Sequence, residues 1–307
     1  MKKVTLFRCI QGGEIKTNMF LTLALFITIA SWAQSGPTEN QINVISANIR
    51  VALKSDATKG HGWEDRKENV FEVIKNQNPD IICLQEVLEV QNNDFKHSFP
   101  NYFSFGFEGP EMDAFTDGEY HLIAKNPILF DLRKFEFIGG GVYWLSEKPH
   151  IGGSISWGSA RARHVNWVRL RSIQTGKVFR VLNTHLDHVS SEAKQNQAKM
   201  IVEESNQYPK DFAQILAGDF NSDSSSVPIQ NLLTSWKDSY GILHNGIDPG
   251  FTVHGFKGPE AATKKGKVDF IFYRGALMPV EAKVIKDNHE GIYPSDHYFV
   301  SATMAFH

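Results

Sequence analysis

Residues 213–221 read Ala213-Gln-Ile-Leu-Ala-Gly-Asp-Phe-Asn221, a mostly apolar run that leads through Gly218 into the polar residues Asp219 and Asn221. A short apolar run that ends in turn-forming residues is typical of a buried β-strand. Loops at strand ends often carry the function of sheet proteins. The stretch therefore predicts a buried strand over residues 213–217 with a carboxylate and an amide at its end.

The same arrangement recurs along the chain, where polar, acidic or histidine residues stand at or just after strand candidates. These are Asn48 in Ser-Ala-Asn-Ile-Arg, Glu86 in Leu-Gln-Glu, His185 in Asn-Thr-His-Leu-Asp-His, Asp269 in Val-Asp-Phe-Ile, and Asp296 and His297 in Ser-Asp-His. Each motif alone is weak, because Asp or Asn at a strand end usually caps a turn or a helix. The ordered set is more specific, and we expect the strand ends to gather these side chains in one cleft.

Strand candidates outnumber helix candidates in the chain. Strands are expected over residues 42–50, 80–84, 101–107, 120–124, 128–137, 142–145, 163–170, 178–184, 213–217, 268–273, 280–286 and 298–304, and helices over 63–77, 190–206 and 227–235. Two sheets packed face to face with helices outside would bury these runs. No Pro/Gly/Ser-rich linker divides residues 34–307, so we expect one domain.

Residues 1–33 have the pattern of a signal peptide. Four basic residues, Lys2, Lys3, Arg8 and Lys16, precede a mostly apolar run over residues 19–30, which is followed by Ser31-Trp32-Ala33. Small residues at this point suit a cleavage site, and the run is shorter than the roughly 20 residues of a membrane span. We therefore expect an exported protein, periplasmic or extracellular, without stable membrane insertion after cleavage. An uncleaved N-terminal anchor is the alternative.

The net charge bears on nucleic-acid binding, and the cysteine content bears on disulfide bonds. The formal net charge of −2 becomes about −5 once the four basic residues and one acidic residue of the leader are removed, and no dense Lys/Arg cluster is present. A tight grip on a nucleic-acid backbone is thus not indicated. Cys83 is the single cysteine left, so no internal disulfide forms, and its apolar surroundings favour a buried, inert thiol.

The polar set is rich in oxygen donors, which suits Mg²⁺, Mn²⁺ or Ca²⁺; a zinc site would want more His or Cys at short spacing. Hydrolysis of a phosphate ester needs a cation on a non-bridging oxygen, an aligned water and stabilisation of charge. Glu86, Asp219 and His297 are suited to supply one each.

In this order the motifs resemble the endonuclease/exonuclease/phosphatase superfamily, which has the DNase I-like fold, over roughly residues 42–304. Residues 139–148 and 183–188 resemble its exported bacterial branch. The resemblance implies an α+β fold, a four-layer α/β/β/α sandwich of two packed, mainly antiparallel sheets. It also implies a divalent-metal-dependent phosphoesterase that acts on a phosphodiester or phosphomonoester by attack of water.

The resemblance also implies residue roles on the metal side of the site. Glu86 matches the principal metal ligand, with Asn48 and Asp296 near the ion. Asp219 and Asn221 match the residues that orient the attacking water and hold a phosphoryl oxygen.

Two histidines complete the implied catalytic set. His297, paired with Asp269, matches the histidine that contacts the phosphate, and His185 matches the second histidine at the scissile phosphate. Glu119 matches a carboxylate that stands behind the second histidine in nuclease relatives; a surface Glu beside a turn is the alternative.

Substrate contacts are expected from Arg163, Tyr143 and Trp157. An exposed arginine on a strand is more often solvated, and the alternating residues Phe103 and Phe105 more often face a core than a ligand. The expected substrate is a phosphorylated small molecule, a lipid headgroup or a glycan, and the expected state is a monomer. A secreted nonspecific nuclease remains an alternative, as does a non-catalytic binding protein of the same fold.

Overall fold

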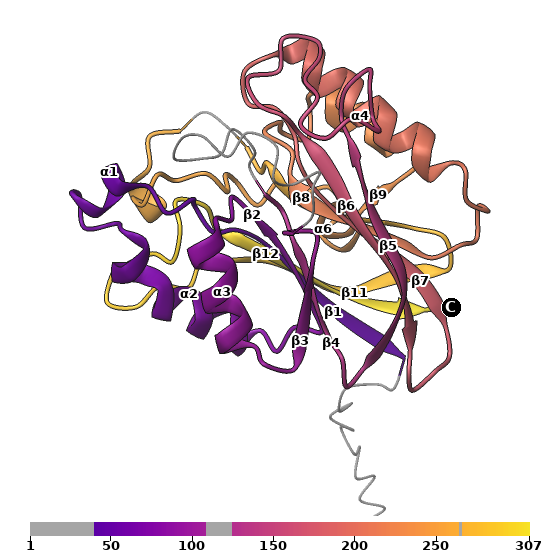
Figure 1. Ribbon diagram of the computed structural model, residues 1–307, viewed down its shortest axis with the longest axis horizontal. Helices are drawn as coiled ribbons and strands as arrows, with labels where there is room; N and C mark the ends of the chain where they lie inside the picture. The colour runs from indigo at the N-terminus through magenta and orange to yellow at the C-terminus, as the bar shows by residue number, and fades with distance from the viewer. Residues whose placement is uncertain (1–39, 109–124, 264–265) are drawn as a thin grey trace, which may run out of the picture. The chain divides into compact units, whose positions relative to one another are not determined.

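Two six-stranded sheets lie face to face in the part of the chain that the structure describes, residues 40–108, 125–263 and 266–307, all within one unit (Figure 1). Its coordinates are a computed structural model. The strands are β1 (Gln41–Asn48), β2 (Ile81–Gln85), β3 (Tyr102–Phe105), β4 (Ile128–Asp131), β5 (Phe135–Trp144), β6 (His164–Ser172), β7 (Val178–His185), β8 (Gln214–Asp219), β9 (Lys237–Asp238), β10 (Asp269–Arg274), β11 (Leu277–Ile285) and β12 (Phe299–Phe306). The first sheet has the order β11-β12-β1-β2-β4-β3 and the second the order β5-β6-β7-β8-β10-β9.

Each sheet contains one parallel pair of strands, β1 with β2 and β7 with β8, and its other pairs are antiparallel. A parallel pair requires a crossover connection, commonly helical. Here α1 (Lys54–Ala57) and α2 (Trp63–Asn76) join β1 to β2, and α4 (Ser191–Ser205) joins β7 to β8. The prediction of two mainly antiparallel sheets is confirmed.

Helices cover the outer faces of both sheets. Val70, Phe71 and Ile74, at helical spacing in α2, are buried in an apolar cluster with the first sheet. Ile201 of α4 and Leu232 of α5 (Val227–Leu233) join a cluster with the second sheet. A third cluster fills the space between the sheets. The resulting order of helix, sheet, sheet and helix, visible for α2 and α4 in Figure 1, is the expected α+β four-layer sandwich.

The prediction of one strand over residues 128–137 is wrong. The chain turns after Asp131, whose carboxylate accepts hydrogen bonds from the backbone and guanidinium of Arg133. β4 ends there and β5 starts in the other sheet. Phe130 before the break and Phe135 after it are both buried, so the apolar pattern of the sequence conceals the break. The predicted strand over residues 142–145 is the end of β5, and that over 120–124 lies outside the described residues.

The sequence pattern does not indicate α3 (Glu89–Ser98). This helix buries one apolar side chain, Phe95, and otherwise the amides of Gln91 and Asn92. Gln91 is satisfied by the backbone, since its Oε1 accepts from Ala52 and Leu88 and its Nε2 donates to Arg50. Buried polar groups leave no apolar stripe for periodicity to detect. The short elements α6 (Ser239–Leu243) and η1 (Gly258–Glu260) are missed for lack of length.

The predicted signal peptide, residues 1–33, lies outside the described residues. In the part that the structure does describe, every helix is too short or too polar to cross a bilayer.

Candidate active site

Strand direction and register bring the predicted residues to one edge of the sandwich. Asn48 ends β1 and pairs in parallel with Gln85, the residue before Glu86. His185 ends β7 and pairs in parallel with Asp219 at the end of β8. Parallel neighbours end at the same edge of a sheet. Asp269 pairs with Asp219 across the antiparallel β8 and β10, so it reaches that edge at the start of its own strand.

Three residues at this edge, Glu86, Asn221 and Gly218, have an unusual backbone conformation or an unusually close backbone contact. Glu86 and Asn221 have positive φ angles of 61° and 47°, which few non-glycine residues adopt, and such residues concentrate at functional sites. Gly218 precedes Asp219, and a Cβ atom there would lie 2.2 Å from the carbonyl oxygen of Thr184 on β7. Only glycine lets β7 and β8 approach so closely beside His185 and Asp219.

Asn48 connects the two sheets within the site. Its Nδ2 atom donates to Oε1 of Glu86 at 3.3 Å and to Oδ2 of Asp219 at 3.0 Å. The second oxygen of Glu86 accepts the backbone N–H of Val51 at 3.1 Å. Glu86 and Asp219 are thus held near one amide although they come from different sheets.

His297 is paired with a buried carboxylate, as expected. Its Nδ1 atom lies 3.0 Å from Oδ2 of Asp269, and its Nε2 atom lies 3.9 Å from Oδ2 of Asp219. Burial lowers the pKa of His297, but Asp269, together with Asp219 and Asp296, raises it well above the usual value. The imidazole is therefore positioned as a cation that contacts or protonates an oxygen.

His185 has the opposite character. Its Nε2 atom lies 2.9 Å from Nδ2 of Asn221 and 3.2 Å from Oδ2 of Asp219. Burial, followed by the charge of Arg163, lowers the pKa of His185 well below the usual value. Burial and the neighbouring Asp269 also raise the pKa of Asp219 to about 6. Titratable groups with pKa values pushed apart in one site are the pattern of acid and base assignments.

Two groups of acids could hold a metal ion. Asp219, Asp269 and His297 offer ligand atoms within 4.8 Å of one another. Glu86 and Asp296 are the acids expected near the ion from the sequence, and burial, with the charge of Glu86 among the causes, raises the pKa of Asp296. Oxygen donors of this kind fit a hard divalent cation.

The guanidinium of Arg50 lies beside Asp296, with its Nη1 atom 3.4 Å from Oδ2, and it also pairs with Asp56 at 2.7 Å. Burial lowers its pKa, but Asp56 and, at longer range, Asp296 raise it above the usual value. The acids at this end of the cleft therefore already stabilise a cation. The sequence could have pointed to Arg50, because it is the last residue of the motif Ser-Ala-Asn-Ile-Arg that contains Asn48.

Arg66 on α2 is a positioning residue that sequence reasoning missed. Its Nη1 atom donates to the carbonyls of Ile49 at 2.5 Å and Pro294 at 2.9 Å, and its Nη2 atom donates to the carbonyl of Arg50 at 2.5 Å. It joins the loop after Asn48 to the loop before Asp296. Nothing in a helical Arg signals this role in the sequence.

The structure places the expected substrate residues in different surroundings. Tyr143 is not brought to the site: it is buried in the apolar cluster between the second sheet and α4, because its position on β5 faces the helices. Trp157 is half-buried in the loop before β6, where its carbonyl accepts the hydroxyl of Ser190 at 2.7 Å. Arg163 is buried rather than solvated, with 3% of its surface exposed. Glu119 lies outside the described residues.

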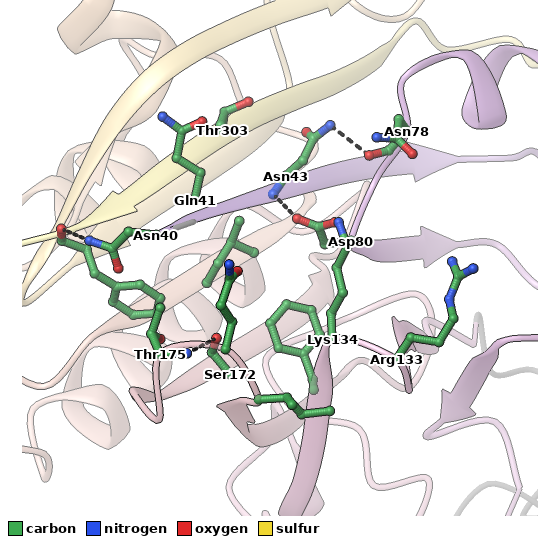
Figure 2. Close-up of a pocket in the computed structure, with 15 residues that line it drawn as sticks. Asn40, Gln41, Asn43, Asn78, Asp80, Arg133, Lys134, Ser172, Thr175 and Thr303 are labelled. Carbon is green, nitrogen blue, oxygen red and sulfur yellow. Dashed lines mark hydrogen bonds and ion pairs between the residues drawn. The ribbon is translucent and has the colours of Figure 1, made fainter. Parts of the chain in front are cut away.

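A separate pocket of about 550 Å³ lies at the opposite ends of the same strands (Figure 2). Asn40 and Asn43 at the start of β1, Lys134 in the turn before β5 and Ser172 at the end of β6 contribute to its lining. None of the predicted site residues lines it. The chemistry gathered at the other edge makes that edge the candidate active site.

The sequence and the fold both match one known family of proteins. A model of the Endonuclease/Exonuclease/phosphatase family matches residues 45–297, and the chain belongs to that family. This membership supports a phosphoric ester hydrolase.

Several relatives are similar along most of the chain. The structure of a mannosyl-6-phosphatase from Bacteroides thetaiotaomicron VPI-5482 is 26% identical, with a TM-score of 0.76, 86% of this chain and 100% of that chain covered. A family protein of Bacteroides thetaiotaomicron is 25% identical, with a TM-score of 0.75, 87% of this chain and 98% of that one covered. A probable CCR4-Not complex 3'-5'-exoribonuclease subunit of Encephalitozoon cuniculi is 27% identical over 79% of this chain, which matches only 57% of that protein's length.

Proposed function

We propose that this protein hydrolyses a phosphate ester by metal-assisted attack of water. The observation that carries the proposal is the joining of Glu86, Asp219 and both histidines at one edge of the sandwich. The two histidines have pKa values shifted in opposite directions within this site. A protonated imidazole beside a neutral one is suited to stabilise charge on one side of a phosphate and to accept a hydrogen bond on the other.

The chain's own residues have separable tasks in this reaction. Asp219, whose Oδ1 accepts the backbone N–H of Asn221 at 2.9 Å, is placed to orient a water. The imidazolium of His297 is a donor for a phosphoryl oxygen, and Asn221, whose Nδ2 atom contacts Nε2 of His185 and the carbonyl of Leu186, holds His185 beside it. Asp269 holds the proton of His297 at Nδ1 and so directs Nε2 to the cleft.

Glu86 and Asp296, with Asn48 beside them, are the residues that would hold a Mg²⁺, Mn²⁺ or Ca²⁺ ion. Such an ion supplies neutralisation of negative charge on a non-bridging oxygen. The carboxylate oxygens, and the attraction that Asp296 exerts on Arg50, support this assignment.

For the substrate we propose a phosphorylated small molecule or glycan, with a lipid headgroup as a further member of the same class. Similarity to a mannosyl-6-phosphatase supports a sugar phosphate. A nonspecific nuclease is the second candidate, favoured by the exoribonuclease relative. The mature chain's formal charge of about −5, derived from the sequence composition, argues against it.

The test is a panel of chromogenic mono- and diesters, sugar phosphates and plasmid DNA, assayed with each divalent ion and with EDTA. We expect ester hydrolysis that stops on chelation and returns with added ion. Asp219→Asn should lower kcat by roughly 10²-fold or more. Asp223→Asn, a half-buried carboxylate in the same loop whose Oδ1 accepts from Ser225, is the matched control and should keep full activity. Full activity after exhaustive chelation would contradict the proposal, and plasmid cleavage as the main activity would favour the nuclease.

We also propose export with cleavage after Ala33. In the native host, N-terminal sequencing of the periplasmic or secreted fraction should give a chain that begins at Gln34. Recovery of the full-length chain in the membrane fraction would support an uncleaved anchor instead.

A further inference from the structure

Arg163 is a buried cation whose charge is not met by an anion among the described residues. Its guanidinium makes one hydrogen-bonding contact, from Nη2 to Nδ1 of His188 at 3.2 Å. Its Nε and Nη1 atoms are buried without a hydrogen-bond partner in this part of the chain. Burial is the largest influence on the pKa of Arg163 and lowers it, although Asp187 and Asp219 act in the opposite direction. A buried charge without a counter-charge is costly unless a ligand provides one.

Two other buried arginines, Arg180 and Arg66, have partners for their terminal nitrogens, although Nε of Arg180 has none among the described residues. Arg180 has no exposed side-chain surface, and it forms two hydrogen bonds of 2.8 Å with the carboxylate of Glu204. Arg66 donates to three backbone carbonyls through its terminal nitrogens. The fold therefore does provide partners for a buried guanidinium where its role is to hold elements together. Among the described residues, Arg163 has no carboxylate or carbonyl partner at the edge where the catalytic residues gather.

The carboxylate with the largest influence on the charge of Arg163, that of Asp187, does not serve as its full partner. Asp187 uses its oxygens on three backbone amides, accepting from Ala160 at 2.9 Å, Val189 at 2.9 Å and Ser190 at 2.6 Å. These hydrogen bonds hold the loop after β7 against the loop before β6. The carboxylate is therefore committed to the loops, and the guanidinium keeps donor capacity for something else.

Arg163 lies near the reacting groups rather than at a distant rim. It stands directly before β6, whose Val165 pairs with Thr184, the residue before His185. After burial, Arg163 has the largest influence on the pKa of His185. The charges of Asp219 and Glu86 in turn raise the pKa of Arg163, against the larger effect of burial. A ligand anion that meets Arg163 would therefore be part of the group bound by His185 and Asp219, not a second group far from it.

We propose that Arg163 binds a non-bridging oxygen of the reacting phosphoryl group and makes this protein prefer phosphomonoesters over phosphodiesters. The inference rests on the proposed function. A monoester carries three non-bridging oxygens and a charge of about −1.5 to −2 at neutral pH, whereas a diester carries two such oxygens and a single charge. The added guanidinium matches the additional oxygen and charge, and it forms the stronger, charge-assisted kind of hydrogen bond.

The kinetic test compares 4-nitrophenyl phosphate with methyl 4-nitrophenyl phosphate, which share a leaving group. Both are assayed with the full mature chain and saturating divalent ion. Arg163→Gln should lower kcat/KM for the monoester by about 10- to 100-fold more than for the diester, the range for a hydrogen bond to a charged group. Arg163→Lys should recover part of the loss. Arg171→Gln, on the same strand but half-exposed and paired with Glu136, should leave the ratio of the two substrates unchanged.

A binding test separates this role from a structural one. Inorganic phosphate should raise the melting temperature of the wild type more than that of Arg163→Met. Without phosphate, Arg163→Met should melt at the same or a higher temperature than the wild type, because it removes an uncompensated buried charge. Arg180→Met, which leaves Glu204 without its partner, should melt lower.

The outcomes distinguish the two proposals. If the wild type hydrolyses neither ester with any ion, the proposed function fails, and the phosphate-dependent melting shift still tests Arg163. If both esters are hydrolysed but Arg163→Gln slows them equally, or if Arg163→Met melts as low as Arg180→Met, the assignment of Arg163 is overturned.

Discussion

The Nδ1 atom of His297 lies 3.0 Å from Oδ2 of Asp269, and both side chains are buried. The pairing joins the loop before β12, a strand of the first sheet, to the first residue of β10, a strand of the second. This hydrogen bond is one of several that link the two sheets near the site, and it fixes which imidazole nitrogen faces the cleft.

Asp269→Asn should therefore act through His297. The variant removes a negative charge that raises the pKa of His297, so this pKa should fall toward that of a buried histidine. An NMR titration of the imidazole protons in metal-free protein measures the change, and kcat should fall by roughly 10²-fold. Asp248→Asn, an exposed carboxylate, should alter neither quantity. An unchanged His297 titration in Asp269→Asn would contradict the role given to Asp269.

The pH dependence of stability should come from neutral buried histidines. Burial, with Arg163 and Lys125 acting in the same direction, lowers the pKa of His164 to about 3, and burial with His297 lowers that of His254 to about 4. Between about pH 4 and pH 6.5, the ordinary pKa of histidine, the unfolded chain binds protons that the folded chain does not. Each such histidine should thus lower stability on acidification through this window, by up to ~1.4 kcal/mol per pH unit, while Asp219, whose folded pKa is raised to about 6, opposes part of this fall below about pH 6.

His297 does not cancel this slope. Its folded pKa is raised, so its contribution is fully present below about pH 6.5 and is lost only as the pH rises through the folded value. Urea denaturation of metal-free protein at several pH values is the measurement. His164→Leu should flatten the slope between pH 4.5 and 6.5, whereas His97→Leu at an exposed position should keep it. Equal slopes in wild type and His164→Leu would count against a neutral buried His164.

Much of this site is predictable from the sequence because its chemistry sits at strand ends. Asn48, His185 and Asp219 follow apolar strands directly, so identifying the strands also identifies the edge where the side chains meet. Glu86 follows β2 in the same way. Tyr143 is the counterexample, since alternation tells that successive residues face opposite sides but not which side is covered by helices.

Other features depend on contacts between segments far apart in the chain. Arg66 donates a hydrogen bond to the carbonyl of Pro294, 228 residues away in sequence, and no local sequence pattern predicts this bond. Burial of Arg163 likewise arises from packing of the loops around β6 and β7. The turn between β4 and β5 depends on a carboxylate that accepts from Arg133 inside an otherwise continuous strand pattern.

Arg66→Met tests whether the loops beside Asn48 and Asp296 need their shared donor. Four carbonyls, those of Ile49, Arg50, His61 and Pro294, would lose a hydrogen bond, so the free energy of unfolding should fall by about 2–4 kcal/mol. Small displacement of catalytic groups is costly, so kcat should also fall by roughly 10-fold or more in the folded enzyme. Lys67→Met, at the next position of α2, should leave kcat unchanged. A destabilised Arg66→Met with wild-type kcat would limit Arg66 to a purely structural role.

Gly218→Ala should lower both stability and kcat, and Gly275→Ala serves as a control that should lower stability alone. A Cβ atom at Gly218 would meet the carbonyl of Thr184 at 2.2 Å, and one at Gly275 would meet the carbonyl of Phe212 at 2.1 Å. Both contacts are with backbone, so strands or turns must shift in either variant. Each should lose about 1–3 kcal/mol of stability, measured by urea unfolding.

The two variants differ in what the shift displaces. Gly218 pairs with Thr184 one residue before the pair His185 and Asp219, so forcing β7 and β8 apart there moves both catalytic side chains. Gly275 lies after β10, at the end remote from Asp269. At a temperature where both variants are folded, Gly218→Ala should have kcat lowered by roughly 10²-fold, whereas Gly275→Ala should keep a value near that of the wild type. Similar kcat values in the two variants would mean that the close approach of β7 and β8 serves the fold and not the positioning of His185 against Asp219.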